Sequence, residues 1–462
     1  DSWIFNTDGE YELEPKQTFH GFQYADLIAE GGVEILSVTG VAISSDNSVR
    51  GQIETSHPGI NKLVSNTFWS LLDNFVSIPT DCPQRDERLG WTGDAQAFVY
   101  AAHSLVDGVA FFRTWLHDLE IEQRKLGGKV PMVVPDILSP TIDENHFFYA
   151  PYGEAGWSDA ATVIPWSIYE RFGDRQLLID QLDSMRAWVA HNTADHEGLL
   201  IPPRMQLGDW LDPDAAEGKP WDAKVSGQFM SNAYHVHSLD IMAATEDLVG
   251  DPAEGQRLRE LRSKVAEVIW NELGEAAAAT PTGAAILLEF NLAPADQRER
   301  IAASLAAGVR DTAGRISTGF LGTPVILDAM SRNGHLDEAF LMLLREQMPS
   351  WLYPITKGYS GFMGSLALTI LMIPTIARTS EEVLNLIPQD LREAGTALGG
   401  TQWRTVAMIV LPAARSGLIT AMILGVARIA GETAPLLLLT GGGDKVNPNP
   451  FSGPIGSLPY YI

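Results

Sequence analysis

The 462-residue sequence, long enough for two or three domains, has little cysteine and few basic residues. Its single cysteine, Cys82, excludes an internal disulfide framework and a cysteine-rich zinc site. Lysine and arginine total 32 against 58 aspartate and glutamate, and the net charge of −26 argues against a nucleic-acid-binding protein. Apolar residues make up 45% of the chain, which excludes a disordered one. The chain begins at Asp1 without a leader pattern, so we expect a piece of a longer polypeptide or a processed product.

The negative charge is confined to the first part of the chain. Residues 359–462 carry six basic and six acidic side chains, so the whole acidic excess lies before residue 359. Residues 361–377 are uncharged over 17 residues, the lower end of the length that spans a bilayer. The alternative is a buried helix of a soluble protein, although such a helix normally keeps a polar face. We therefore predict a soluble first part, cytoplasmic or exported, and membrane-type helices in the last part.

Apolar spacing predicts about eleven helices and a mainly α fold. Residues 1–56 instead predict strands, with β-rich runs at Val33–Leu36 and Val41–Ser44. The predicted helical segments are 60–75, 94–106, 108–124, 159–171, 174–193, 231–248, 253–273, 281–290, 295–308, 318–333 and 336–348. Eleven is one helix short of six hairpins closed into an (α/α)6 toroid. Loops 125–158 and 199–228 exceed the usual limit of about 12–15 residues, which makes them candidate functional loops.

The loop after the first long helix concentrates groups that suit sugar chemistry. Within the 14 residues Asp81–Asp94 it holds four carboxylates, two arginines and a tryptophan. A carboxyl group held protonated serves as an acid, other carboxylates accept hydrogen bonds from sugar hydroxyls, and an aromatic face stacks on a sugar ring. The alternative is a solvated charged loop in which Asp94 merely caps the next helix.

The string DCPQRDERLGWTGD at Asp81–Asp94 resembles the signature of the α-L-rhamnosidase family of glycoside hydrolases. Further segments resemble the same family in the same order, namely Gly156–Ala160, Gly208–Leu211, Thr318–Gly322 and Pro349–Pro354. The resemblance covers residues 1 to about 358. It implies the tail of a β-sandwich domain at 1–56 and an (α/α)6 catalytic domain at 57–358, which acts with inversion on terminal α-L-rhamnose.

The resemblance also implies roles for single residues. Glu87 corresponds to the general acid. The implied substrate-binding residues are Asp81, Arg85, Asp86, Trp91, Asp94, Trp157, Asp159, Asp209 and Trp210, with the tryptophans as stacking walls. The family's general base, a glutamate soon after the Ser-Trp-Leu-Tyr segment, has no counterpart here, because no acidic residue follows until Glu381. We therefore expect a catalytic domain truncated before its last helix, with the general base absent, impaired turnover, no cofactor and no metal.

The last part, 359–462, resembles the membrane subunit of a bacterial phosphate ABC transporter. Its residues that match the permease coupling motif are Glu393, Ala394, Gly399, Leu411 and Pro412. The string Gly431–Pro435 narrows the resemblance to the phosphate branch. The resemblance implies an ABC ATPase subunit as partner and an inner- or plasma-membrane location. Arg428 and Glu432 stand four residues apart, either along a phosphate path or as a mutually neutralising pair.

Two truncated and unrelated sequences thus adjoin near Gly358–Ser360 without a linker. Natural fusions usually join whole domains through exposed linkers, so we interpret the chain as a chimeric open reading frame. Its dominant identity is a rhamnosidase-type glycoside hydrolase that acts on rhamnose-containing glycosides. One alternative is a phosphate transport component that carries a soluble rhamnoside-binding region. Another is that the C-terminal helices fold back and complete the toroid.

Overall fold

The computed structural model describes residues 2–15, 18–21, 26–83, 88–143, 146, 152–194, 199–203, 205–216 and 218–357. The chain divides into two compact units. The larger unit consists of Val41–Cys82 and Glu87–Thr356, and the other of Asp1–Gly40, Pro83–Asp86 and Lys357–Ile462. The described residues of the second unit form no helix or strand. The predicted membrane-type helices, the coupling motif, Arg428 and Glu432 all lie outside the described residues.

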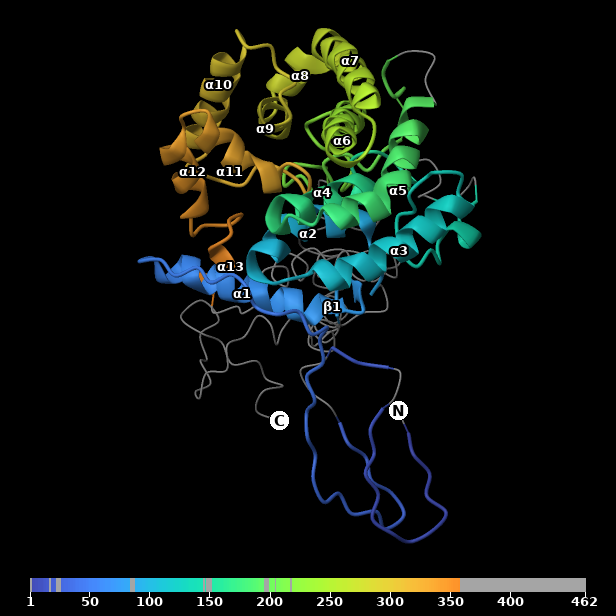
Figure 1. Cartoon of the computed structure of the whole chain (residues 1–462). Coiled ribbons are helices and arrows are strands. Elements are labelled where there is room, and N and C mark those ends of the chain that lie inside the picture. The colour runs from blue at the N-terminus through green and yellow to red at the C-terminus, as the bar shows by residue number, and fades with distance from the viewer. Residues whose placement is uncertain are drawn as a thin grey trace, which may run out of the picture. The chain divides into compact units, whose positions relative to one another are not determined.

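Helices provide nearly all the regular structure described in the larger unit (Figure 1). They are α1 (Pro58–Asn74), α2 (Thr92–Leu105), α3 (Val109–Lys125), α4 (Ala160–Phe172), α5 (Arg175–Ala194), α6 (Gly227–Val249), α7 (Pro252–Ile269), α8 (Glu275–Ala278), α9 (Pro281–Glu289), α10 (Arg298–Asp311), α11 (Thr323–Arg332), α12 (Leu336–Leu343) and α13 (Tyr353–Thr356). Short 3₁₀ and π turns lie at Ser139–Thr141 and Trp270–Gly274. Strands β1 (Phe75–Val76) and β2 (Ile78–Pro79) pair antiparallel, with Phe75 opposite Pro79 and Val76 opposite Ile78. The predicted mainly helical fold is confirmed, and each of the eleven predicted segments contains a helix, although several bounds differ, as at 318–333, where α11 begins only at Thr323.

Several helices begin at caps that are visible in the sequence. The Asp251 carboxylate accepts a hydrogen bond from the backbone N–H of Ala253 (2.9 Å) at the start of α7. The Thr280 hydroxyl accepts one from the N–H of Gly283 (3.1 Å) at the start of α9. A proline follows each cap, where its missing N–H leaves no donor unsatisfied. Side chain and proline together define where each helix starts.

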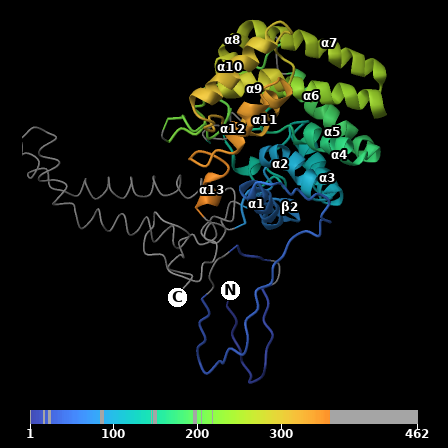
Figure 2. The same ribbon diagram turned by 90° about the vertical axis from the view of Figure 1, so that its left-hand side faces the viewer.

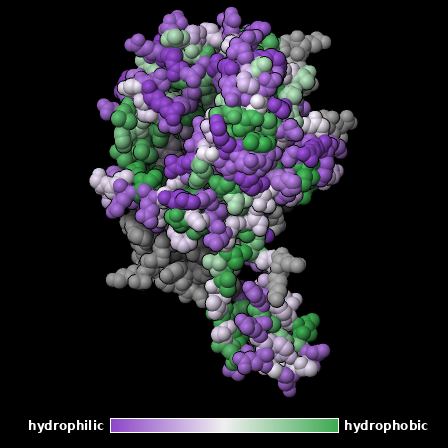
Figure 3. Space-filling view, in the orientation of Figure 1, coloured by the Kyte–Doolittle hydropathy of each residue, from purple (hydrophilic) through white to green (hydrophobic). Residues whose placement is uncertain are grey.

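The helices follow one another around a ring (Figures 1 and 2). Helices α2, α4, α6, α9 and α11 contact one another in that order. Helices α6 and α9 are buried on nearly all sides, as expected for inner helices, whereas α7 and α10 bury one face only. Hydrophilic residues predominate on the upper part of the surface in Figure 3, where α7 and α10 lie. Inner and outer helices thus alternate along the chain.

The ring reaches its end at α13. This four-residue helix is the last one described, and it packs against α1, which in turn contacts α2. The inner helices described are thus α2, α4, α6, α9 and α11, and α13 is the last helix among the described residues. The sequence leaves the rhamnosidase-like pattern shortly after α13, near residue 358.

The predicted strands at Val33–Leu36 and Val41–Ser44 are wrong in this structure. No residue of these runs is in a strand, and Ile35, Leu36 and Val41 are 48%, 68% and 68% exposed. Among the described residues before α1, only Val49 forms an isolated β-bridge, to Val106. Strand propensity expresses packing against neighbouring strands, and the described backbone offers these runs none. The assignment of 1–56 to a β-sandwich domain stays a prediction.

Candidate active site

Three predicted site residues, Arg85, Asp86 and Glu87, lie outside the described residues. The two ends of their loop are held together, because the Leu89 N–H donates to the Asp81 carboxylate (3.4 Å). Asp81 is therefore placed beside the start of the segment that leads into α2.

The start of α2 carries Trp91 and Asp94 and is clamped to neighbouring loops. The Thr92 N–H donates to the carbonyl of Met132 (2.9 Å), and the Thr92 hydroxyl lies 3.2 Å from the carbonyl of Trp157. A Cβ at Gly93 would lie 2.5 Å from the Trp157 ring, so only glycine permits this approach. Asp94 is half-buried in the first turn of the helix, where a carboxylate is favoured by the helix dipole.

The three predicted stacking tryptophans come together. Trp91, Trp157 and Trp210 all pack against one apolar cluster formed by buried Met132, Tyr152 and Leu207. They come from three separate segments, before α2, before α4 and before α6. The two long loops predicted to be functional supply the cluster. Each of the three indoles is only half-buried, so the cluster supports them and leaves part of each exposed.

Asp159 anchors the segment that carries Trp157. Its fully buried carboxylate accepts hydrogen bonds from the Gly156 N–H (2.5 Å), the Trp188 indole N–H (3.0 Å) and the Ser238 hydroxyl (2.9 Å). Burial raises the pKa of Asp159 to about 6, and these donors oppose the rise. In the structure the carboxylate therefore contacts protein donors and holds the loop.

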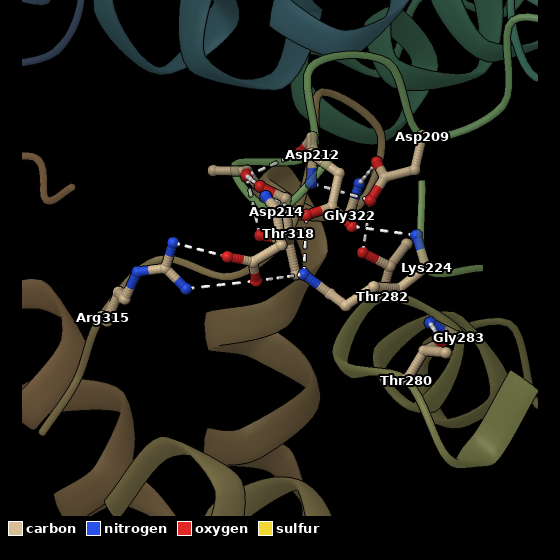
Figure 4. Close-up of polar contacts among 12 residues, drawn as sticks. Asp209, Asp212, Asp214, Lys224, Thr280, Thr282, Gly283, Arg315, Thr318 and Gly322 are labelled. Carbon is tan, nitrogen blue, oxygen red and sulfur yellow. Dashed lines mark hydrogen bonds and ion pairs between the residues drawn. The ribbon is translucent and has the colours of Figure 1, made fainter. Parts of the chain in front are cut away.

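Asp209 anchors the segment that carries Trp210, as Asp159 anchors that of Trp157 (Figure 4). Its buried carboxylate accepts hydrogen bonds from the N–H groups of Gly319 (2.7 Å), Leu321 (2.9 Å) and Gly322 (2.9 Å). The Thr282 hydroxyl donates to the same carboxylate. Burial raises the pKa of Asp209. One side chain thus ties the Gly208–Leu211 segment to the Thr318–Gly322 segment and to α9.

The Thr318–Gly322 segment closes the aromatic arrangement. The Phe320 N–H donates to the Trp210 carbonyl (2.7 Å), and the Phe320 ring stacks on Trp157 with centroids 5.0 Å apart. A Cβ at Gly319 would lie 2.2 Å from the Asp209 carbonyl oxygen, so this position requires glycine. The segment was recognised from the sequence, but nothing there predicted a site role for Phe320.

Four charged residues that the sequence analysis missed form a network, two of them shortly after Trp210 in sequence (Figure 4). We call Asp212, Asp214, Lys224 and Arg315 the ionic clasp. The Lys224 ammonium lies 2.6 Å from Asp212 and 2.7 Å from Asp214, and Arg315 donates to both oxygens of Asp214 (3.1 and 2.7 Å). Hydrogen bonds from Arg315 and then Lys224 lower the pKa of Asp214 to about 2. The only sequence signal was the position of three of them in a long predicted functional loop.

Comparison with known proteins agrees with this architecture. The family model of the bacterial alpha-L-rhamnosidase 6 hairpin glycosidase domain matches residues 48–362, more than half of the chain. The chain belongs to this rhamnosidase family. An alpha-L-rhamnosidase of Formosa agariphila is 34% identical over 78% of this chain and 38% of its own length, and one of Streptomyces avermitilis is 34% identical over 78% and 33%. The chain therefore spans about a third of the length of these relatives.

Solved structures place the same helical body in the rhamnosidase family. The native rhamnosidase of Aspergillus terreus matches with a TM-score of 0.61 and 34% identity over 68% of this chain and 36% of that one. The rhamnosidase of Streptomyces avermitilis, solved in complex with L-rhamnose, matches with a TM-score of 0.61 and 32% identity over 69% of this chain and 29% of that one.

A second similarity covers the end of the chain. The family model of the binding-protein-dependent transport system inner membrane component matches residues 302–455. The phosphate transport system permease protein PstA of Mycobacterium leprae is 44% identical over 112 residues, 24% of this chain and 37% of its own length. Within the described part of the chain, no helix is both long and apolar enough to cross a membrane. The same residues contain no group of three or more His, Cys, Asp or Glu side chains suited to hold a metal ion.

The Gly319→Ala substitution tests the junction of the two motif segments. The added Cβ must displace the Asp209 and Trp210 backbone, so we expect a loss of about 1–3 kcal/mol in the free energy of unfolding and a changed tryptophan emission spectrum. Gly308→Ala in α10 is the matched control, because its Cβ meets nothing within 4 Å. It should stabilise the protein by about 0.5–1 kcal/mol. Equal effects of both changes in urea unfolding would contradict the close approach at Gly319.

The buried carboxylate of Asp159 predicts a pH dependence of stability. Its folded pKa of about 6 lies above the ordinary value of 3.8, so the folded state binds the proton more tightly than the unfolded state. This contribution is complete below about pH 4 and is lost between pH 4 and 6, by up to about 3 kcal/mol. The free energy of unfolding of the wild type minus that of Asp159→Asn should therefore fall over this range. A flat difference for Asp159→Asn would contradict the assignment.

Proposed function

We propose that the larger unit binds terminal α-L-rhamnose and is an inverting rhamnosidase with impaired turnover. The observation that carries the proposal is the convergence of Trp91, Trp157 and Trp210 on one apolar cluster beside the Asp81–Asp94 segment. Indole faces stack on the apolar face of a pyranose ring, while the acidic loop supplies hydrogen-bond acceptors for its hydroxyls. Membership of the rhamnosidase family and a relative solved with L-rhamnose support the same sugar.

In the proposed reaction Glu87 donates its proton to the glycosidic oxygen as the bond to the anomeric carbon breaks. Asp81, Arg85, Asp86 and Asp94 hold sugar hydroxyls. Asp159 and Asp209 contribute to binding of the same sugar indirectly, because their hydrogen bonds hold the segments that carry Trp157 and Trp210. An inverting enzyme also needs a second carboxylate that activates water on the opposite face of the ring. No acidic residue lies between Lys357 and Glu381, where the family pattern would supply this base. The proposed site therefore contains the general acid and lacks the general base.

A small nucleophile tests for the missing base. Without a positioned base, turnover of an α-L-rhamnosyl-glucose disaccharide should run about 10²–10⁴-fold below that of a rhamnosidase that has one. Azide needs no deprotonation, so it should accelerate the reaction and yield the β-L-rhamnosyl azide, detected by NMR. Glu87→Gln is the control, since the leaving oxygen then receives no proton and azide should not help. Unassisted turnover at the rate of a complete relative would refute the missing base. Failure of the wild type to bind L-rhamnose in calorimetry would refute the rhamnoside function.

A second candidate function is a phosphate transport component with a rhamnoside-binding region. The similarity of 112 residues to the PstA permease favours it. The coupling residues Glu393, Ala394 and Gly399 would then contact an ABC ATPase subunit, and the last part would lie in the membrane. We consider a chimeric reading frame the simpler origin, since two partial matches meet without a linker.

One long sequencing read of the source DNA across codons 340–380 separates these origins. A chimera produced by assembly should give a read that passes from codon 358 into rhamnosidase-like sequence with a Trp-Glu string and no permease sequence. A read that crosses codons 358–360 as written would refute an assembly error. The control is a second read across codons 200–240, which should match the present sequence in either case.

A further inference from the structure

A second tryptophan lies beside Trp210 without belonging to any recognised motif. Trp221 comes from the same 199–226 loop, and its ring centroid is 6.2 Å from that of Trp210 with the planes inclined by 34°. Trp210 is half-buried against the apolar cluster, whereas Trp221 is 37% exposed. The two rings thus form one aromatic surface, of which Trp221 is the more exposed part.

The backbone around Trp221 is held in place before any ligand arrives. Leu211, next to Trp210, has φ = 62°, a left-handed conformation that is unfavourable for leucine. Its N–H donates to the carbonyl of Pro220 (2.8 Å), the residue before Trp221. The backbone next to Trp210 is therefore hydrogen-bonded to the backbone next to Trp221.

The ionic clasp holds the backbone that follows Trp221 in sequence. The fully buried Asp212 carboxylate accepts the Lys224 N–H (3.1 Å) as well as its ammonium group (2.6 Å). Asp214 is tied in turn to Arg315, about a hundred residues further along the chain (Figure 4). Both flanks of Trp221 are thus fixed, which lowers the entropy lost when a ligand settles on its ring.

We propose that Trp221 is the stacking subsite for the group attached to rhamnose, with the ionic clasp as its positioning device. This inference rests on the proposed rhamnoside function. The ligand group is one with a flat apolar face, either an aromatic ring or the C–H face of a hexose. Because both cations of the clasp are paired with carboxylates, the subsite selects for ring surface and not for a charge on the leaving group.

Calorimetric binding to the full chain tests the subsite without depending on turnover. The probes are methyl α-L-rhamnoside, which has no second ring, phenyl α-L-rhamnoside and α-L-rhamnosyl-glucose. We expect the wild type to bind both ring-bearing ligands more tightly than the methyl ligand. Trp221→Ala should weaken the two ring-bearing ligands about 3–10-fold and leave the methyl ligand unchanged, and Trp221→Phe should restore most of the loss. Arg315→Ala should give a smaller loss of the same kind, and Arg315→Lys should restore only part of it, because an ammonium group cannot reproduce the paired hydrogen bonds to Asp214.

The possible outcomes distinguish failure of the proposed Trp221 subsite from failure of the proposed rhamnoside function. Trp69→Ala, at a 54% exposed tryptophan on α1, is the matched control and should change none of the affinities. Equal weakening of all three ligands by Trp221→Ala would overturn the inference, since Trp221 would then belong to the rhamnose pocket. Unchanged affinities would overturn it as well. If Trp221→Ala weakens the binding of only one ring-bearing ligand, that ligand identifies whether the subsite binds the aromatic ring or the hexose face. Absence of methyl rhamnoside binding in the wild type would instead refute the proposed function, and the inference with it.

Discussion

The carboxylate of Asp209 accepts hydrogen bonds from three backbone N–H groups and one hydroxyl while it lies out of contact with water. Removing an ionised carboxylate from water is costly unless such donors replace its hydration. Three of the donors lie within the four residues 319–322. Their hydrogen bonds therefore fix the position of this segment relative to the Asp209 carboxylate. The segment then positions Phe320 against Trp157, and the Asp209 backbone carries Trp210. The aromatic arrangement of the site follows from this single anchor.

Asp159 holds the segment that carries Trp157 in the same way. It lies two residues after Trp157, accepts the N–H of Gly156, and reaches α5 and α6 through Trp188 and Ser238. In both cases a buried acid lies within two residues of a half-buried tryptophan in sequence. Through their hydrogen bonds, Asp159 contacts α5 and α6, and Asp209 contacts α9. Glycines at 93 and 319 allow the backbones to approach closely enough for this to occur.

The helices were predictable from the sequence because their signal is local. Apolar spacing located all eleven segments that contain the longer helices. The strands were not predictable, since β-rich runs such as Val33–Leu36 need partners that spacing does not reveal. The convergence of the three motif tryptophans agrees with the prediction that they share one site. The ionic clasp could not be foreseen, because Asp214 and Arg315 are far apart in sequence and ordinary in type.

In the proposed function, binding and turnover depend on different parts of this chain, so the two are separable. The aromatic cluster, its two buried acids and the clasp all come from residues between 91 and 322, within helices that contact one another in series. The proposed general base would follow α13, where the rhamnosidase match ends at residue 362 and acidic residues are absent until Glu381. Stacking and hydrogen bonding depend on groups already held in place by these anchors. Activation of water depends on one further carboxylate at a set distance, and no neighbouring packing can substitute for it. Under the proposed function, a sugar site of this construction keeps recognition separate from the general base.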